Sequence, residues 1–201
     1  MNNLPLECIV SRKPKQYLRQ GLGHCGVYSL KAILSAYGKD NKNHPKGYHT
    51  NWIGRNLFSF AMGRKYHDKI FASYGIQTET TSAKHLQDEE KLTLLKTLLA
   101  QDTPVMIRIG NGYVACTYNP IIGTFMPHWV TLWGYDDDRK LFYIYDSRLP
   151  EECWDSNLPI GNTTRTYKEI LRDWNFGDKP WHFFSWNTSR DSFLYIRIVS
   201  R

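Results

Sequence analysis

The sequence predicts an α+β fold, in which an N-terminal layer of helices packs on a C-terminal antiparallel sheet. In the first half of the chain, apolar residues recur at three- and four-residue spacing, which is typical of amphipathic helices. In the second half, β-rich apolar runs alternate with polar turns. The chain has no internal repeat, low-complexity tract or long Pro/Gly/Ser linker, so one domain over residues 1–201 is expected.

The first helix is predicted over residues 25–37, after a short strand at 6–10. Gly38 follows the pattern and is typical of a helix end. The apolar face of this helix comprises Val27, Leu30, Ile33, Leu34 and Tyr37. Because the pattern starts at Cys25, this cysteine is expected at the first position of the helix.

The other helices are identified by their caps and leucine-rich faces. Thr50 can cap the second helix and Asp88 the fourth, and Thr166 and Glu169 have the spacing of a capping box. A polar loop over 39–49 precedes the second helix. The helices are expected at 50–62, 66–74, 88–101 and 166–174.

The strands are predicted where β-branched and aromatic residues cluster between turn residues. They are expected at 76–80, 105–109, 127–135, 141–147, 181–186 and 192–199, the last two forming a closing hairpin. The segment 118–124 is expected to be a loop that approaches His128 and lines a cleft wall, with a plain hairpin as the alternative.

Composition restricts the partners and the location. The net charge is +7, from 26 basic and 19 acidic residues, but the basic clusters carry no nucleic-acid-binding motif, so a nucleic-acid partner is not expected. No run approaches the roughly 20 apolar residues of a membrane span, and the first residues lack the pattern of a secretory signal. The protein is therefore expected in the cytoplasm, or exported without a cleaved signal peptide. The sequence predicts no oligomeric state.

The cysteines and histidines predict neither a disulfide framework nor a metal site. The four cysteines are sparse and irregular, so reduced thiols are expected, and no Cys-x-x-Cys pair indicates zinc. His24 lies next to a cysteine, but no matching ligand motif accompanies it, so no metal and no cofactor are expected. The remaining histidines of the N-terminal half are interpreted as loop and helix-surface residues: His44, His49 and His67.

Cys25 is the first candidate for chemistry. At a helix start, a thiol faces unpaired backbone N–H groups and the positive end of the helix dipole, and both stabilise the thiolate. That environment makes a cysteine nucleophilic. The alternative is an inert buried thiol, which is the common state of a free cysteine.

A predicted hairpin supplies the partners of a nucleophile. If its turn is centred on Asp138, facing residues have numbers that sum to about 276, so His128 lies opposite residue 148 and diagonal to Asp146. A cysteine activated by a histidine that a carboxylate orients is the arrangement used for nucleophilic acyl transfer. The sequence therefore predicts the set Cys25, His128 and Asp146.

These motifs resemble a known family. The sequence is similar to papain-like cysteine peptidases of the bacteriocin-processing type, over about residues 17 to 175, in the motifs Gln20…Cys25-Gly26, Pro104-Val105-Met106-Ile107, His128-Trp129-Val130 with Gly134-Tyr135-Asp136, and Tyr143-Ile144-Tyr145-Asp146. The resemblance implies a papain-like fold, with Cys25 as nucleophile, His128 as general base and acid, Asp146 as orienting residue and Gln20 as oxyanion-hole donor. The family usually places its glutamine one residue upstream, where this chain has Arg19.

The resulting functional prediction is a cysteine peptidase-like hydrolase that cleaves a peptide or amide bond through an acyl-thioester on Cys25. A peptide or protein substrate is implied. The same residues would also serve an acyltransferase or a glutamine deamidase. A different class, a non-catalytic peptide-binding module on this fold, is favoured by the short spacing between Gln20 and Cys25.

Overall fold

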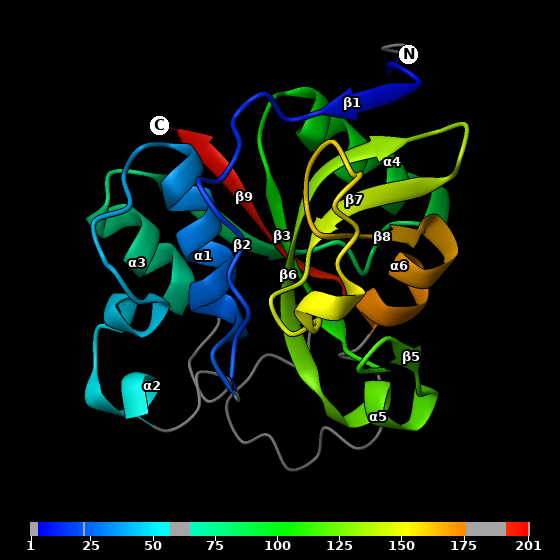
Figure 1. The fold of residues 1–201 in the computed structure, drawn as a ribbon. Helices are drawn as coiled ribbons and strands as arrows, with labels where there is room; N and C mark the ends of the chain where they lie inside the picture. Colours follow the sequence, from blue (N-terminus) through cyan, green and yellow to red (C-terminus); the bar gives the residue numbers. More distant parts are fainter. Residues whose placement is uncertain (1–3, 22, 57–64, 176–191, 201) are drawn as a thin grey trace.

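The computed structural model describes residues 4–21, 23–56, 65–175 and 192–200 (Figure 1). Within these residues, seven strands form one antiparallel sheet in the order β2-β9-β3-β6-β7-β8, and β1 pairs with the end of β6. A second, two-stranded sheet joins β4 and β5. The strands are β1 (Glu7–Ile9), β2 (Gln77–Ser82), β3 (Val105–Gly110), β4 (Tyr113–Val114), β5 (Thr117–Tyr118), β6 (Pro127–Asp136), β7 (Leu141–Tyr145), β8 (Thr163–Thr166) and β9 (Leu194–Ser200).

The helices flank this sheet in two groups. In Figure 1, α1, α2 and α3 gather at the left, whereas most strands, with α4 and α6, fill the right. Contacts join α1 to β6 and α3 to β2, and α4 and α6 both contact β3. The helices are α1 (Cys25–Ala36), α2 (Trp52–Asn56), α3 (Tyr66–Ser73), α4 (Asp88–Ala100), α5 (Pro120–Phe125) and α6 (Tyr167–Trp174), with short 3-10 turns η1 (Pro45–Tyr48) and η3 (Glu151–Cys153).

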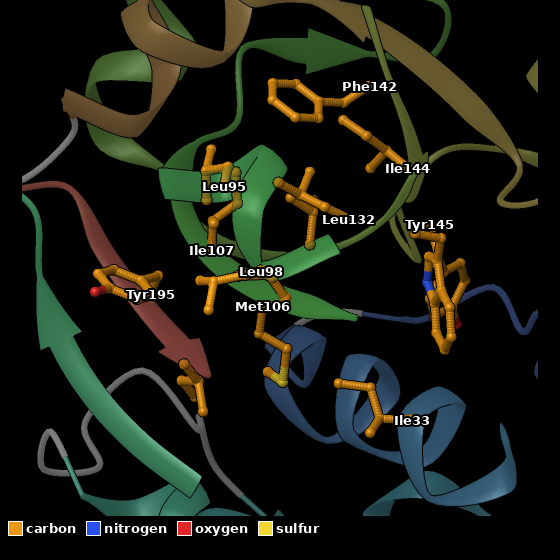
Figure 2. Close-up of a cluster of buried hydrophobic side chains, with 14 of the residues drawn as sticks. Ile33, Leu95, Leu98, Met106, Ile107, Leu132, Phe142, Ile144, Tyr145 and Tyr195 are labelled. Atoms are coloured by element: carbon orange, nitrogen blue, oxygen red, sulfur yellow. The ribbon is translucent and has the colours of Figure 1, made fainter. Parts of the chain in front are cut away.

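The core lies between the sheet and these helices. Figure 2 shows Ile33 on α1 and Met106 on β3 within one cluster of buried side chains. Because β3 pairs with β6 on one side and β9 on the other, it is a central strand, and its continuous apolar run is buried on both faces. Burying a side chain of this size contributes about 1.5–3 kcal/mol. Strand β6 pairs with β3, and β7 pairs with β6, so both strands that carry the C-terminal motifs are anchored to the buried core.

The predicted α+β class, with its helical layer and antiparallel sheet, is confirmed. Helix α1 begins at Cys25 as predicted, and α6 begins with the capping box of Thr166 and Glu169. The cap of α4 differs, because Gln87 and Glu90 form the capping box in place of Asp88. The second helix is described only as far as Asn56, and the strand predicted at 181–186 lies outside the described residues.

Two segments depart from the prediction. Residues 118–124 are neither a plain loop nor a simple hairpin: the short β4–β5 hairpin leads into α5, which Asn119 caps through its side chain. Strand β8 was not predicted, because the run Thr163-Thr164-Arg165-Thr166 lacks apolar alternation. It pairs with β7 and adds an edge strand to the sheet.

The thiols also differ in part from the prediction. Cys8 and Cys25 are free, as expected, but Cys116 and Cys153 form a disulfide with their Cα atoms 5.6 Å apart. The prediction of reduced thiols is wrong for this pair, because chain folding brings together two cysteines that are 37 residues apart. The disulfide links the β4–β5 hairpin to η3.

Candidate active site

Cys25 occupies the first position of α1, and the residue is partly buried. The sulfur accepts hydrogen bonds from the His128 side chain and from the backbone N–H groups of Trp129 and Gly26. Burial alone would raise the pKa of the Cys25 thiol, but these hydrogen bonds and the charge of His128 hold it below its ordinary value. The first turn of α1, strand β6 and the His128 side chain thus all donate to the sulfur.

His128 faces Cys25 from the sheet. It lies near the start of β6, and 2% of the residue is exposed. Its Nε2 lies 2.7 Å from Oδ1 of Asp146, so the other ring nitrogen, Nδ1, is left to contact the sulfur. Burial lowers the pKa of His128, but the Asp146 carboxylate and the Cys25 sulfur raise it to about 9. The surroundings therefore favour an imidazolium beside a thiolate.

The strand register explains how His128 and Asp146 meet. In the β6–β7 hairpin, Thr131 faces Tyr145, so the numbers of facing residues sum to 276 at this end, as predicted. Near the turn the register is displaced by one residue around Trp133. Asp146 follows β7 directly and lies diagonal to His128, a separation that side chains span readily.

Asp146 is fully buried, with hydrogen bonds on both carboxylate oxygens. Oδ1 accepts from His128 and from the Arg148 backbone N–H at 3.0 Å, and Oδ2 accepts from Nη2 of Arg165 at 2.7 Å. Burial raises the pKa of Asp146, but His128 and Arg165 lower it more, so the pKa lies well below its usual range. Asn162 fixes the backbone here, because its side chain bonds both the N–H and the carbonyl of Asp146.

Gln20 lies beside the residue that follows Asp146. Its backbone N–H donates to the Ser147 carbonyl at 2.7 Å, and its side-chain Oε1 accepts from the Ser147 hydroxyl at 2.5 Å. Because Ser147 occupies the amide oxygen, the amide nitrogen is directed elsewhere. The structure therefore places Gln20 at the same strand end as Asp146, with its amide held in a defined orientation.

Gly26, next to the nucleophile, lies under a histidine ring. A Cβ at this position would lie 2.1 Å from Nε2 of His67, so any larger residue would displace either the ring or the helix start. The His67 ring also contacts Trp129 edge to face. Burial, with a contribution from Arg108, lowers the pKa of His67 to about 4, so the ring is neutral near pH 7.

A second histidine pair supports the turn before α1. Nδ1 of His24, the N-cap residue, lies 3.1 Å from Nε2 of His49, and Nδ1 of His49 lies 2.9 Å from the Tyr66 hydroxyl. His49 is 2% exposed and His67 is 5% exposed. His49 lies in a loop, as expected, but it is buried, and the interpretation of His67 as a helix-surface residue is wrong. The reason is that α3 and the loop before α2 pack directly against the start of α1.

Residues 4–21, 23–56, 65–175 and 192–200 contain no group of three or more His, Cys, Asp or Glu arranged to hold a metal ion. Over the same ranges, no helix is long and apolar enough to cross a membrane.

Sequence reasoning missed several residues that support the site. Arg165 lies on an edge strand with no recognisable pattern, and Ser147 is an ordinary residue at a strand end. His67 is one polar residue on a short helix. Only the position of Ser147, directly after the predicted Asp146, offered a signal that it would lie near the site.

Chemically, the arrangement joins a thiol, an imidazole and a buried carboxylate in sequence. Cys25 comes from the helical layer, whereas His128 and Asp146 come from the sheet. Such a set can form a thiolate–imidazolium pair and transfer a proton during acyl transfer.

Comparisons with known proteins concern the family and the fold. The model of the Peptidase_C39 like family matches residues 11–171. No curated protein is significantly similar to this chain in sequence.

Solved structures share the fold at low sequence identity. A double glycine motif protease from an AMS/PCAT transporter, solved with its leader peptide, is 14% identical with a TM-score of 0.54, over 97% of this chain and 99% of that one. A protein of Bacillus anthracis described as a C39-like peptidase is 16% identical with a TM-score of 0.56, over 97% and 98%. Xylellain, a cysteine protease from Xylella fastidiosa, is 15% identical with a TM-score of 0.55, over 99% and 87%. The predicted papain-like fold is thereby confirmed.

Proposed function

The chain belongs to the Peptidase_C39 like family, and from this premise we propose that it is a cysteine peptidase-like hydrolase that cleaves a peptide or amide bond. The observation that carries the proposal is the hydrogen-bonded series from the Cys25 sulfur through His128 to Asp146. A structural thiol has no need of a buried imidazole whose second nitrogen is engaged by a buried carboxylate. That arrangement is what a thiol nucleophile requires.

In the proposed mechanism, the Cys25 thiolate attacks the carbonyl carbon and forms a carbon–sulfur bond. The carbonyl oxygen becomes an oxyanion. When this intermediate collapses, the carbon–nitrogen bond breaks and His128 donates its proton to the departing amine. His128 then takes a proton from water, which attacks the thioester. The carbon–sulfur bond breaks, and the acid leaves together with the Cys25 thiolate, which restores the thiolate–imidazolium pair.

Gln20 is proposed as the side-chain donor to that oxyanion, together with the backbone N–H of Cys25 in the first turn of α1. The hydrogen bond from Ser147 supports this role, because it engages the amide oxygen and leaves the amide nitrogen to donate. Asp146 is proposed to hold the His128 ring in the tautomer and orientation that transfer requires.

A peptide is the proposed substrate class. The double glycine motif protease of similar fold was solved with a leader peptide, which is consistent with a peptide as ligand.

The Cys116–Cys153 disulfide bears on location, because disulfides persist in oxidising compartments. We therefore propose that the protein works in an oxidising compartment.

The test compares the pH dependence of Cys25 alkylation by iodoacetamide in wild type and His128→Ala, followed site by site with mass spectrometry. Cys8 is an internal control, since burial and the nearby Asp102 raise the pKa of its thiol. Cys25 is expected to react well below the ordinary thiol pKa of about 8.5, and to lose that advantage in the variant. If Cys25 and Cys8 show the same profile, the proposal fails and a non-catalytic binding module is the better description.

A second measurement identifies the bond. Incubation with a peptide library and mass spectrometry of the products separates a chain break from acyl transfer to an amine, and from a mass increase of about one dalton, the sign of deamidation. Cys25→Ala is the matched control. Product formation that persists in Cys25→Ala would refute the acyl-thioester mechanism.

A further inference from the structure

Behind His128 and Asp146 lies a second buried charged group that the mechanism above does not use. Arg165, on β8, is 3% exposed, and its guanidinium joins two carboxylates. Nη2 lies 2.7 Å from Oδ2 of Asp146, and Nη1 lies 3.3 Å from Oδ2 of Asp173 on α6. Lysine and arginine are almost never fully buried unless paired, so this placement calls for an explanation.

The contact with Arg165 restricts how Asp146 can move. One carboxylate oxygen bonds His128 and the Arg148 N–H, and the other bonds Arg165. Rotation of the carboxylate would break hydrogen bonds on both oxygens at once. The bond from Arg165 to Oδ2 therefore fixes the carboxylate plane in which Oδ1 accepts the His128 N–H.

Arg165 is itself held from two sides. Its guanidinium carbon lies 4.0 Å from the ring centroid of Tyr113, which covers it from the β4–β5 hairpin. On the other side, Asp173 is fixed by two bonds from Arg172, at 2.7 and 3.0 Å, and by the Tyr118 hydroxyl at 3.1 Å. Arg165 therefore cannot leave Asp146 without disturbing α6 and the hairpin.

Asp146 and Asp173 face the guanidiniums of Arg165 and Arg172, and the Glu169 carboxylate also interacts with both guanidiniums. The proposed thiolate–imidazolium pair adds one charge of each sign. Asp146 is thus compensated by Arg165 whether or not His128 carries its proton. Buried ion pairs are weak evidence of added stability, so a role in the site is the better account of this one.

We propose that Arg165 is a positioning residue of this site: it keeps Asp146 ionised and in the plane that aligns His128, and Asp173 holds Arg165 for that purpose. Arg165 touches no reacting atom and acts through Asp146. This inference rests on the proposed function, because positioning matters only if His128 serves Cys25.

The test is the pH profile of Cys25 alkylation by iodoacetamide in Arg165→Met and Arg165→Lys. The groups facing Asp146 are His128 from β6 and Arg165 from β8. Loss of the guanidinium leaves Asp146 buried with a single charged partner, so it protonates at higher pH and no longer supports the imidazolium. In Arg165→Met the pKa of Asp146 is expected to rise by about 1–3 units, the effect of losing an opposite charge within 4–6 Å of a carboxylate. The acid limb of the Cys25 profile is expected to move up with it. The acid limb of Arg165→Lys, which keeps the charge, is expected to lie between those of wild type and Arg165→Met.

Arg197→Met is the matched control. It removes a guanidinium that pairs with Glu79 across β2 and β9, away from Asp146 and Asp173. Its profile should match wild type. If Arg165→Met does not fold, Arg165→Met/Asp173→Asn removes one charge of each sign together and should show the same upward movement.

The outcomes separate the two proposals. In one outcome, wild-type Cys25 is alkylated at lower pH than Cys8, and the folded Arg165 variants give the same profile. This result overturns the positioning role alone. A wild-type Cys25 that reacts like Cys8 overturns the proposed function and this inference with it. Adding Arg165→Met to an Asp146→Asn background should have no further effect on the profile, and a full additional movement would refute action through Asp146.

Discussion

Removal of the disulfide between Cys116 and Cys153 should cost the fold a large and predictable part of its stability. The bond closes a loop of 37 residues that contains both His128 and Asp146. With the loop-entropy relation, a ring of this length contributes about 4 kcal/mol at 25 °C. For a chain of this size, that corresponds to a fall in Tm of roughly 8–16 °C.

The assay is urea unfolding of wild type and Cys116→Ser/Cys153→Ser, each with and without a phosphine reductant. Reductant should lower the unfolding midpoint of wild type and leave the double variant unchanged. Cys8→Ser is the matched control, because that thiol is free. It should keep the full response to reductant.

Two results would refute this reasoning. One is a wild-type midpoint that does not respond to reductant although mass spectrometry shows the bond has been reduced. The other is an equal response in the double variant, which would assign the effect to something besides this bond. Cys25 alkylation should survive reduction below the unfolding transition, because the disulfide joins the β4–β5 hairpin to η3, whereas Cys25 lies on α1.

Three further predictions concern the site. The specificity constant kcat/KM should fall as pH rises through about 9. The pKa of His128 is raised to about 9, so the imidazolium that protonates the leaving amine is lost above this pH. A value of kcat/KM that keeps rising to pH 10 would contradict this. Replacing Gln20 by Ala should lower kcat about 10²–10³-fold with little change in KM, as for the loss of one oxyanion donor, and steady-state kinetics showing less than about a threefold loss would remove Gln20 from that role. Gly26→Ala should destabilise the fold by about 1–3 kcal/mol in urea unfolding, because its Cβ would lie 2.1 Å from the His67 ring; combined with His67→Ala the cost should be less than additive, and strict additivity would show that the ring is not the obstacle.

The parts of the fold that could be predicted are those determined by local sequence patterns. Helix α1 carries its own apolar period and end signal, and the turn residues of the β6–β7 hairpin fix a register that places His128 near Asp146. Those two local patterns are sufficient to nominate Cys25, His128 and Asp146.

What the sequence did not reveal depends on contacts between distant segments. Arg165 reads as a polar residue in a threonine run, and its burial is decided by β7 on one side and α6 on the other. The pairing of Cys116 with Cys153 depends likewise on how two loops meet. His49 and His67 were taken for surface residues because a single histidine carries no periodic signal. Burial of a lone polar residue is a tertiary property, which no local pattern records.

One consequence concerns the order in which this chain is synthesised. Cys25 comes from the helical layer and His128 from the sheet, about a hundred residues later. Until β6 has joined β3 and β7, the emerging chain carries an ordinary thiol, with neither the imidazole nor the carboxylate beside it. Under the proposed function, enhanced reactivity at Cys25 requires the finished fold, so a partly made or partly unfolded molecule should not cleave neighbouring proteins. The rate of Cys25 alkylation during refolding should therefore report when the helical layer and the sheet have come together.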